Sequence, residues 1–259
     1  MRIDTYPVGL LLVPGWVAAT LVGLALVRRS LHRRDLPRAQ EVASYLFAAV
    51  GTLYAVILGL IVVDSMTKFA EARLTVEAEA NALADVVLFA SQLPGEDARR
   101  VRELAREYIR SATEEEWPEM VRGAASAEAR RLAVQLSRAI LGFEPATGRE
   151  EAIFGAQVEA ATRFWDGRRT RLMIASEGGL PALQWLVLLA GGAITVVFTY
   201  FFKVDDLRVQ MALTGMLSAV IALNLYLILM FASPFSGDVA VRPDGFEAAR
   251  HILGEAGGG

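Results

Sequence analysis

Cysteine is absent from this 259-residue chain, which excludes disulfide bonds, thiolate catalysis and zinc–sulfur sites and leaves the redox compartment open. Histidine is also rare, because only His32 in a basic loop and His251 near the C-terminus occur. No glycine-rich phosphate loop follows a strand, and no Ser/His/Asp triad or paired-carboxylate arrangement is apparent. The sequence therefore predicts no catalytic residues, no cofactor and no enzymatic activity.

Strong charge of either sign is missing as well. The net charge is −3, and no basic stripe with interleaved aromatic residues occurs, so a nucleic-acid partner is not expected. Two short acidic runs, Glu114–Glu116 and Asp205–Asp206, are interpreted as solvated surface and not as metal sites. Four apolar windows contain no ionisable residue, which argues against proton pumps and ion-coupled carriers.

These four windows span 20–24 residues each without Asp, Glu, Lys or Arg: Val8–Val27, Val42–Val63, Pro181–Phe202 and Val209–Ala232. A hydrocarbon core about 30 Å thick requires ~20 helical residues, so four transmembrane helices in a lipid bilayer are predicted. Arg28 and Arg29 follow the first window directly, which favours a retained helix over a cleaved signal peptide.

A segment of about 115 residues separates the second and third windows. It is rich in Ala, Glu, Arg and Leu and lacks strand-like alternation, so helices are predicted. Turn signals divide it at Pro94-Gly95, Gly123–Ser126 and Glu144–Thr147. Thr147 and Glu150 have the spacing of a capping box, and Gly178-Gly179 ends the last helix. An all-α integral membrane protein is therefore predicted, with a bundle of about four helices continuous with the second and third membrane helices.

The predicted organisation has four parts. Residues 1–63 hold membrane helices at about 8–27 and 42–63, joined by a basic loop at 28–41. Residues 64–178 form the soluble bundle, and residues 179–232 hold membrane helices at about 181–202 and 209–232. The tail, 233–259, has a short amphipathic stretch around Phe246–Leu253 and a glycine-rich end that is expected to be disordered.

The second window passes without a helix breaker into an amphipathic segment that reaches Leu93, so one helix is expected to leave the membrane and enter the bundle. Beyond the membrane, Phe69, Val76 and Leu83 recur every seven residues and form a seam for a partner helix. That partner is either the last soluble helix of the same chain or another subunit.

Two further faces of this helix differ in character. Gly51, Ala55 and Gly59 recur every four residues and predict close packing against another helix. A nearly opposite side carries a candidate pore wall, Tyr54, Ile57 and Ile61, and then a candidate pore mouth, Asp64, Glu71, Thr75 and Glu79. This polar stripe is either a solvated helix face or a carboxylate-lined vestibule built by several subunits.

The run from Phe47 to Gly59, followed by Phe69–Arg73 and Val76–Leu83, resembles the bestrophin-like family of bacterial membrane proteins. Two further motifs match the same pattern, Glu116-Trp117-Pro118 and Leu180-Pro181, and the resemblance covers roughly residues 42–235. The family name implies a distant similarity to bestrophins, which are pentameric anion channels with four membrane helices and a helical soluble region. No residues match the bestrophin pore neck or calcium clasp.

Two functions compete on these observations. The first is a homo-oligomeric ion channel or pore that passes inorganic ions, for which the acidic mouth suggests cations and the family name suggests anions. The second is a non-conducting membrane scaffold or signalling protein whose soluble bundle binds a partner.

The basic loop predicts the orientation in a bacterial inner membrane. Short loops as basic as this one stay cytoplasmic, which would leave both termini and the bundle extracytoplasmic. The loop carries Arg28, Arg29, Arg33, Arg34 and Arg38. The bundle side of the third membrane helix is also basic, with Arg163, Arg168, Arg169 and Arg171. The short loop outweighs them because long domains translocate largely regardless of charge.

Overall fold

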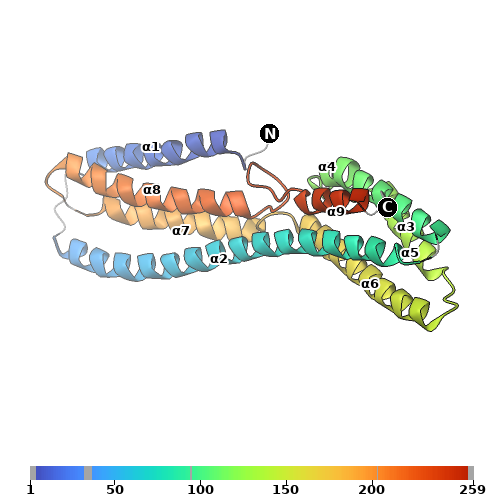
Figure 1. Ribbon diagram of the computed structural model, residues 1–259. Coiled ribbons are helices and arrows are strands. Elements are labelled where there is room, and N and C mark those ends of the chain that lie inside the picture. The colour runs from blue at the N-terminus through green and yellow to red at the C-terminus, as the bar shows by residue number, and fades with distance from the viewer. Residues whose placement is uncertain (1–3, 32–36, 94, 203, 256–259) are drawn as a thin grey trace. The chain divides into compact units, whose positions relative to one another are not determined.

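The computed structural model describes residues 4–31, 37–93, 95–202 and 204–255. Every regular element within these ranges is a helix (Figure 1), in agreement with the all-α prediction. The elements are α1 (Tyr6–Leu31), α2 (Pro37–Ala90), α3 (Gly95–Ser111), the π-helix η1 (Ala112–Glu116), α4 (Trp117–Met120), α5 (Ala127–Leu141), α6 (Gly148–Glu177), α7 (Ala182–Tyr200), α8 (Leu207–Phe231) and α9 (Asp244–Glu255). Pro94, the loop residues Arg33 and Arg34 and the glycine-rich end at 256–259 lie outside the described residues.

The chain folds into two compact units. The first unit comprises Met1–Lys68, Gly179–Ser233 and Gly237–Val239, and the second comprises Phe69–Gly178, Pro234–Ser236 and Ala240–Gly259. Helix α2, a single helix of 54 residues, contributes to both units because the division falls within it, after Lys68. The predicted passage of one helix from an apolar span into an amphipathic segment is therefore present in the structure.

The first unit contains α1, α7, α8 and the first part of α2, which lie side by side (Figure 1). Four helices of the described chain are long and apolar enough to cross a membrane, and each predicted window overlaps one of them. Both α1 and α2 extend into the predicted loop 28–41, to Leu31 and from Pro37. Basic residues are favourable in the last turn of a helix and proline is favourable in the first, which accounts for these longer ends.

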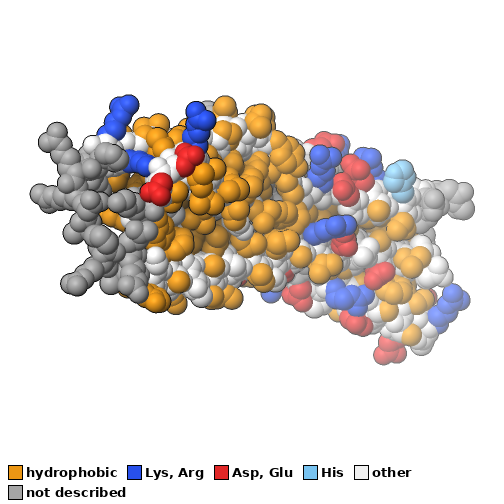
Figure 2. Space-filling model, turned by 90° about the vertical axis from the view of Figure 1, so that its left-hand side faces the viewer, with side chains coloured by type: hydrophobic (Ala, Val, Ile, Leu, Met, Phe, Trp, Pro, Cys, Tyr) orange, Lys and Arg blue, Asp and Glu red, His pale blue; other side chains and the backbone are white. Residues whose placement is uncertain are grey.

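The surface of the first unit is strongly apolar. Many large hydrophobic side chains are exposed in the single chain, among them Leu10, Leu53, Leu183 and Leu213. Figure 2 shows hydrophobic side chains gathered over a broad area of one face, with acidic and basic side chains gathered outside it. An apolar surface this extensive marks contact with lipid or with other protein.

Tyrosine–glycine contacts join the helices of the first unit. In each contact, a tyrosine hydroxyl donates to a backbone carbonyl of a neighbouring segment, and a nearby glycine leaves room for the ring. The hydroxyl of Tyr226 donates to the Thr5 oxygen (3.3 Å) beside Gly9, that of Tyr200 donates to the Thr20 oxygen (2.7 Å) beside Gly23, and that of Tyr54 donates to the Leu188 oxygen (3.1 Å) beside Gly191 and Gly192.

A polar contact fixes the turn between α7 and α8. Arg28 of α1 donates to the Gln210 side-chain oxygen (2.8 Å) and to the Val204 carbonyl oxygen (3.1 Å). The Gln210 amide in turn donates to the Phe202 carbonyl oxygen (2.9 Å). Buried polar groups need such partners, so this network holds the end of α1 against the turn.

The second unit is built around one hydrophobic core, to which α2, α3, α5, α6 and α9 contribute. Val76 and Leu83 of the seven-residue seam are fully buried there, and Phe69 packs against the same core. The core also includes Phe164 of α6, so the seam is covered by the chain's own helices, as well as Phe246 and Leu253 of α9.

Local signals set the ends of α6. The backbone amide of Glu150 donates to the Thr147 hydroxyl (3.2 Å), while the Glu150 carboxylate accepts from the Ala146 amide (2.7 Å). The predicted N-terminal cap is thus confirmed, with the carboxylate reaching one residue further back than in a standard capping box. Gly178 ends the helix with a φ of +68°, which glycine adopts readily.

Candidate functional site

One side of α2, named here the outer flank, carries Ile57, Asp64, Glu71 and Thr75 and so includes part of the predicted pore mouth. Asp64 and Glu71 are exposed in the single chain, and Thr75 is half-buried. The Asp64 carboxylate lies 3.3 Å from the Lys68 ammonium group one turn further along the helix, and both side chains are about half exposed. Asp64 therefore does not present an uncompensated negative charge.

The predicted pore wall is only partly placed on this flank. Ile57 is 40% exposed, but Tyr54 is buried and Ile61 packs beside it against the cluster formed by α7 and α8. Tyr54 and Ile61 turn toward α7 and α8 because the helical repeat sets both residues beside Leu58, on the row that faces these helices.

Sequence reasoning missed the side of α2 that the chain leaves most open. Val56, Leu60 and Val63 are all strongly exposed. At about 100° per residue they lie roughly opposite Leu58. A uniformly apolar helix does not reveal which row is buried, so no signal in the sequence distinguishes this side.

The predicted packing face of α2, with Gly51, Ala55 and Gly59, is left open in the described chain. Ala55 and Gly59 are exposed, and a methyl group added at Gly51 or Gly59 would meet no atom within 4 Å. The close helix partner predicted for this face is therefore not supplied by the described part of this chain.

Glu79 departs from the prediction, since its side chain is fully buried in the second unit and not part of an exposed mouth. Its two carboxylate oxygens accept from Nε (2.6 Å) and Nη2 (2.9 Å) of Arg171 on α6. The Tyr108 hydroxyl of α3 donates to the same carboxylate at 2.5 Å. The cause is the helical repeat, because Glu79 lies on the same side of α2 as Val76 and Leu83.

Two further charges complete this buried ion cluster, which comprises Glu79, Glu116, Arg168 and Arg171. Nη2 of Arg171 donates to the Glu116 carboxylate at 2.8 Å, and Arg168 pairs with the other oxygen of Glu116. All four side chains are at most 5% exposed. Two carboxylates and two guanidinium groups cancel, so the cluster carries no net charge in a region that could not tolerate one.

Apolar groups enclose the cluster. The guanidinium carbon of Arg171 lies 5.2 Å from the centre of the Trp117 ring and 5.8 Å from that of Phe246, so it makes cation–π contacts with both. Burial, and then the neighbouring Glu79 carboxylate, raise the pKa of Tyr108 well above its usual value. Burial alone would lower the pKa of Arg171, but Glu79, Tyr108 and Glu116 together outweigh burial and raise it well above its usual value. Tyr108 therefore remains a donor and Arg171 remains charged.

The π-helix η1 explains how Glu116 reaches this cluster. Trp117 is nine residues after the buried Tyr108, so a regular α-helix, at about 100° per residue, would place it on the opposite side. The wider turn over Ala112–Glu116 delays this rotation, and both Glu116 and Trp117 face the core. The sequence contained the motif Glu116-Trp117-Pro118, but nothing in its composition revealed a π-turn.

Residues 15–246 match the model of the Bestrophin-like domain, which covers most of the chain. The chain belongs to the Bestrophin-like family. Similar solved structures include variants of a bacterial bestrophin homologue from Klebsiella pneumoniae. One has 15% identity and a TM-score of 0.72 and covers 95% of this chain and 99% of the other. Another has 18% identity and a TM-score of 0.65 and covers 97% and 98%.

A structure described as a membrane protein is similar at 14% identity, with a TM-score of 0.71 and coverage of 95% of this chain and 99% of the other. No curated protein matches the chain. At identities this low, the structural similarity shows a shared fold alone. The bestrophin-like chain described here is thus a helical membrane protein, and the matched range includes both the outer flank of α2 and the buried ion cluster.

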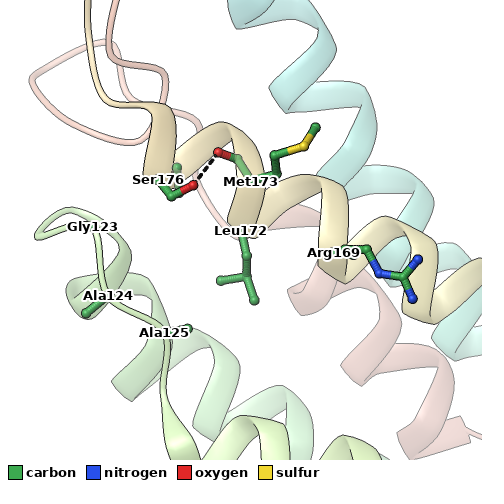
Figure 3. A pocket seen from close by; sticks show the side chains of 8 residues that line it. Gly123, Ala124, Ala125, Arg169, Leu172, Met173 and Ser176 are labelled. Carbon is green, nitrogen blue, oxygen red and sulfur yellow. Dashed lines mark hydrogen bonds between the residues drawn. The ribbon is translucent and has the colours of Figure 1, made fainter.

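A shallow hollow in the second unit offers little chemistry to this bestrophin-like protein (Figure 3). The loop Gly123–Ala125 faces α6 across it, and Leu172 points toward that loop, whereas Arg169 points away. The hydroxyl of Ser176 donates a hydrogen bond to the Met173 carbonyl oxygen (2.8 Å). Polar groups do not converge there, and the described residues contain no group of three or more metal-ligating His, Cys, Asp or Glu side chains.

Proposed function

We propose that this bestrophin-like chain assembles with copies of itself into an ion channel or pore, in which the outer flank of α2 lines the conduction path. The observation that carries the proposal is the course of α2. One uninterrupted helix is long and apolar enough to cross a membrane and then exposes Asp64, Lys68 and Glu71. Several copies of such a helix around an axis would form an apolar passage with a charged mouth.

Two further observations support assembly. The face with Gly51, Ala55 and Gly59 lacks a neighbour in the described chain, and small residues allow close approach between helices in lipid. Membership of the Bestrophin-like family also supports a channel, because bestrophins are oligomeric ion channels. Oligomeric state follows from the mass of the purified protein in detergent, and a monomer would rule out an axial pore.

The charges near the proposed mouth bear on selectivity. Asp64 and Lys68 form an ion pair and Arg73 pairs with Glu77 at 3.2 Å, which leaves Glu71 as the uncompensated charge among these residues. A ring of Glu71 carboxylates would raise the local concentration of cations. We therefore propose a modest preference for cations, smaller than Asp64 and Glu71 together would give.

Removing either partner of the Asp64–Lys68 pair is expected to move selectivity in opposite directions. Asp64→Asn leaves Lys68 uncompensated and should shift the reversal potential toward anions, whereas Lys68→Gln should shift it toward cations. A unit charge about 5 Å from the ion path contributes about 0.8 kcal/mol in bulk water, or about fourfold in local ion concentration. The measurement is current across planar bilayers containing the purified protein, under a salt gradient.

Salt dependence provides the control for this pair of variants. Both shifts should diminish near 1 M salt, where the Debye length is about 3 Å. A current that neither substitution alters would place Asp64 and Lys68 outside the conduction path. Absence of current under all conditions would favour a scaffold or signalling role whose second unit binds a partner.

We further propose that the second unit and both termini are extracytoplasmic, on the basis of the short basic loop after α1. Ala127 is exposed at the start of α5 and suits a cysteine probe better than Ser126, which is buried and caps that helix. Ala127→Cys is expected to react with a membrane-impermeant maleimide in intact spheroplasts, and the chain has no native cysteine to interfere. Reaction only after lysis would place the second unit in the cytoplasm.

A further inference from the structure

The contact between Tyr54 of α2 and Gly191-Gly192 of α7 is unusually close. Tyr54 is buried, and its hydroxyl donates to the Leu188 carbonyl oxygen at 3.1 Å. A methyl group at Gly191 would lie 2.5 Å from Cδ2 of the ring, and one at Gly192 would lie 3.0 Å from the hydroxyl oxygen. Only glycine, which has no side chain, thus leaves room for the Tyr54 ring at these two consecutive positions.

A second contact lies on the same side of α2. The Phe47 ring meets the Phe202 ring edge-on at 5.3 Å and lies 6.5 Å from the Phe198 ring of α7. Seven residues separate Phe47 from Tyr54, which is about two helical turns, so both residues face α7. Of these two contacts, only the one from Tyr54 includes a hydrogen bond. The strength of a hydrogen bond depends on its direction, whereas apolar packing is largely non-directional.

Direction matters for a helix surrounded by lipid. Lipid tails are as apolar as leucine side chains, so burial of apolar surface does little to fix the rotation of a membrane helix about its own axis. A directed bond from a rigid ring set against two glycines does fix that rotation. The other flanks of α2, including Ile57 and Asp64, are carried with it, because a helix turns as one body.

We propose that Tyr54 is a positioning residue that sets the rotation of α2 against α7 and thereby which flank of α2 is presented outward. The consequence for conduction rests on the channel function proposed above, whereas the rotation itself does not. A turn of about 40° moves a side chain at a radius of about 5 Å by about 3.5 Å, which would change the wall of a narrow pore.

Tyrosine-to-phenylalanine substitutions provide a matched test. Tyr54→Phe removes the hydroxyl from the α2–α7 contact, and Tyr200→Phe removes the same kind of bond from the α7–α1 contact, where Tyr200 donates to the Thr20 oxygen at 2.7 Å. Both variants should lose similar thermal stability. A purely structural role would therefore not distinguish them.

The distinguishing readout is the accessibility of single cysteines on α2. Ile57→Cys and Val63→Cys are introduced separately into the cysteine-free chain, and their reaction with a methanethiosulfonate reagent is followed in proteoliposomes. Tyr54→Phe is expected to change the ratio of the two rates by about fivefold, the population change that loss of one typical hydrogen bond permits. Tyr200→Phe should leave the ratio unchanged. Gly191→Ala, which adds a methyl group where the Tyr54 ring lies, should change the ratio further in the same direction.

The outcomes separate this proposal from the proposed channel function. Equal ratios in the Tyr54→Phe and Tyr200→Phe proteins would overturn the positioning role, whether or not the protein conducts. A changed ratio in a protein that carries no current would support the positioning role and contradict the channel. If the Gly191→Ala protein does not fold, the nearly isosteric Tyr54→Phe comparison still decides the question.

Discussion

Replacing Arg171 with alanine is expected to lower the free energy of unfolding of the second unit by about 3–5 kcal/mol, the usual cost of breaking a buried ion pair. The Glu79 carboxylate would lose two hydrogen bonds and that of Glu116 would lose one, in a region from which water is excluded. Thermal unfolding of the purified protein, followed by circular dichroism, measures the loss. An unchanged melting temperature would contradict the burial of this cluster.

Arg169 provides the matched control on the same helix. Its side chain is 75% exposed and pairs only loosely with Asp166 at 3.6 Å, so Arg169→Ala should change stability by less than about 0.5 kcal/mol. A second comparison isolates the pairing. Arg171→Met together with Glu79→Met should be less destabilised than Arg171→Met alone, because the double variant leaves no buried charge at residue 79.

Gly167→Ala is expected to destabilise the second unit by about 1–3 kcal/mol, the usual cost of inserting a methyl group into a close-packed region. The added methyl would lie 2.9 Å from Cβ of Glu79 and 3.0 Å from its Cα. Backbone atoms cannot yield as the end of a side chain can, so α6 would have to move away from α2 beside the ion cluster. Denaturant unfolding with the slope compared to the parent protein measures this effect.

The control for this substitution has the opposite sign. Gly155 lies on the same helix, is exposed and has no atom within 4 Å of an added methyl group. Gly155→Ala should therefore stabilise the helix by up to about 1 kcal/mol through propensity alone. Equal effects at the two glycines would show that the close crossing of α2 and α6 does not occur in solution.

Much of the fold followed from the sequence because it depends on patterns one helix long. Windows without charge locate the long apolar helices, and the seven-residue spacing of Val76 and Leu83 locates the buried seam. Glycine and the Thr147 cap locate the ends of α6. Each of these signals reflects a local requirement, either burial along one side of a helix or a partner for a free backbone amide.

The site was harder to predict because it depends on which helices meet. Glutamate is a residue type usually found at the surface. Burial of the Glu79 carboxylate is tolerated only because Arg171, 92 positions later, compensates its charge. Tyr54 was assigned to a pore wall because an apolar helix gives no indication of the row that faces its neighbours. The π-turn before Trp117 changes the phase of a helix without any proline or glycine to mark it.

The ion cluster also constrains the order in which the second unit can fold. Arg171 is 92 residues from Glu79 and 55 from Glu116. The carboxylates of these two residues therefore reach Arg171 only after long loops of chain have closed. Before that point, transferring the guanidinium group into the core costs several kcal/mol without recompense. Partially assembled cores that already enclose Arg171 are thereby disfavoured. Folding of this unit should consequently be all-or-none, with α6 gaining and losing protection from hydrogen exchange together with the segments that carry Glu79 and Glu116.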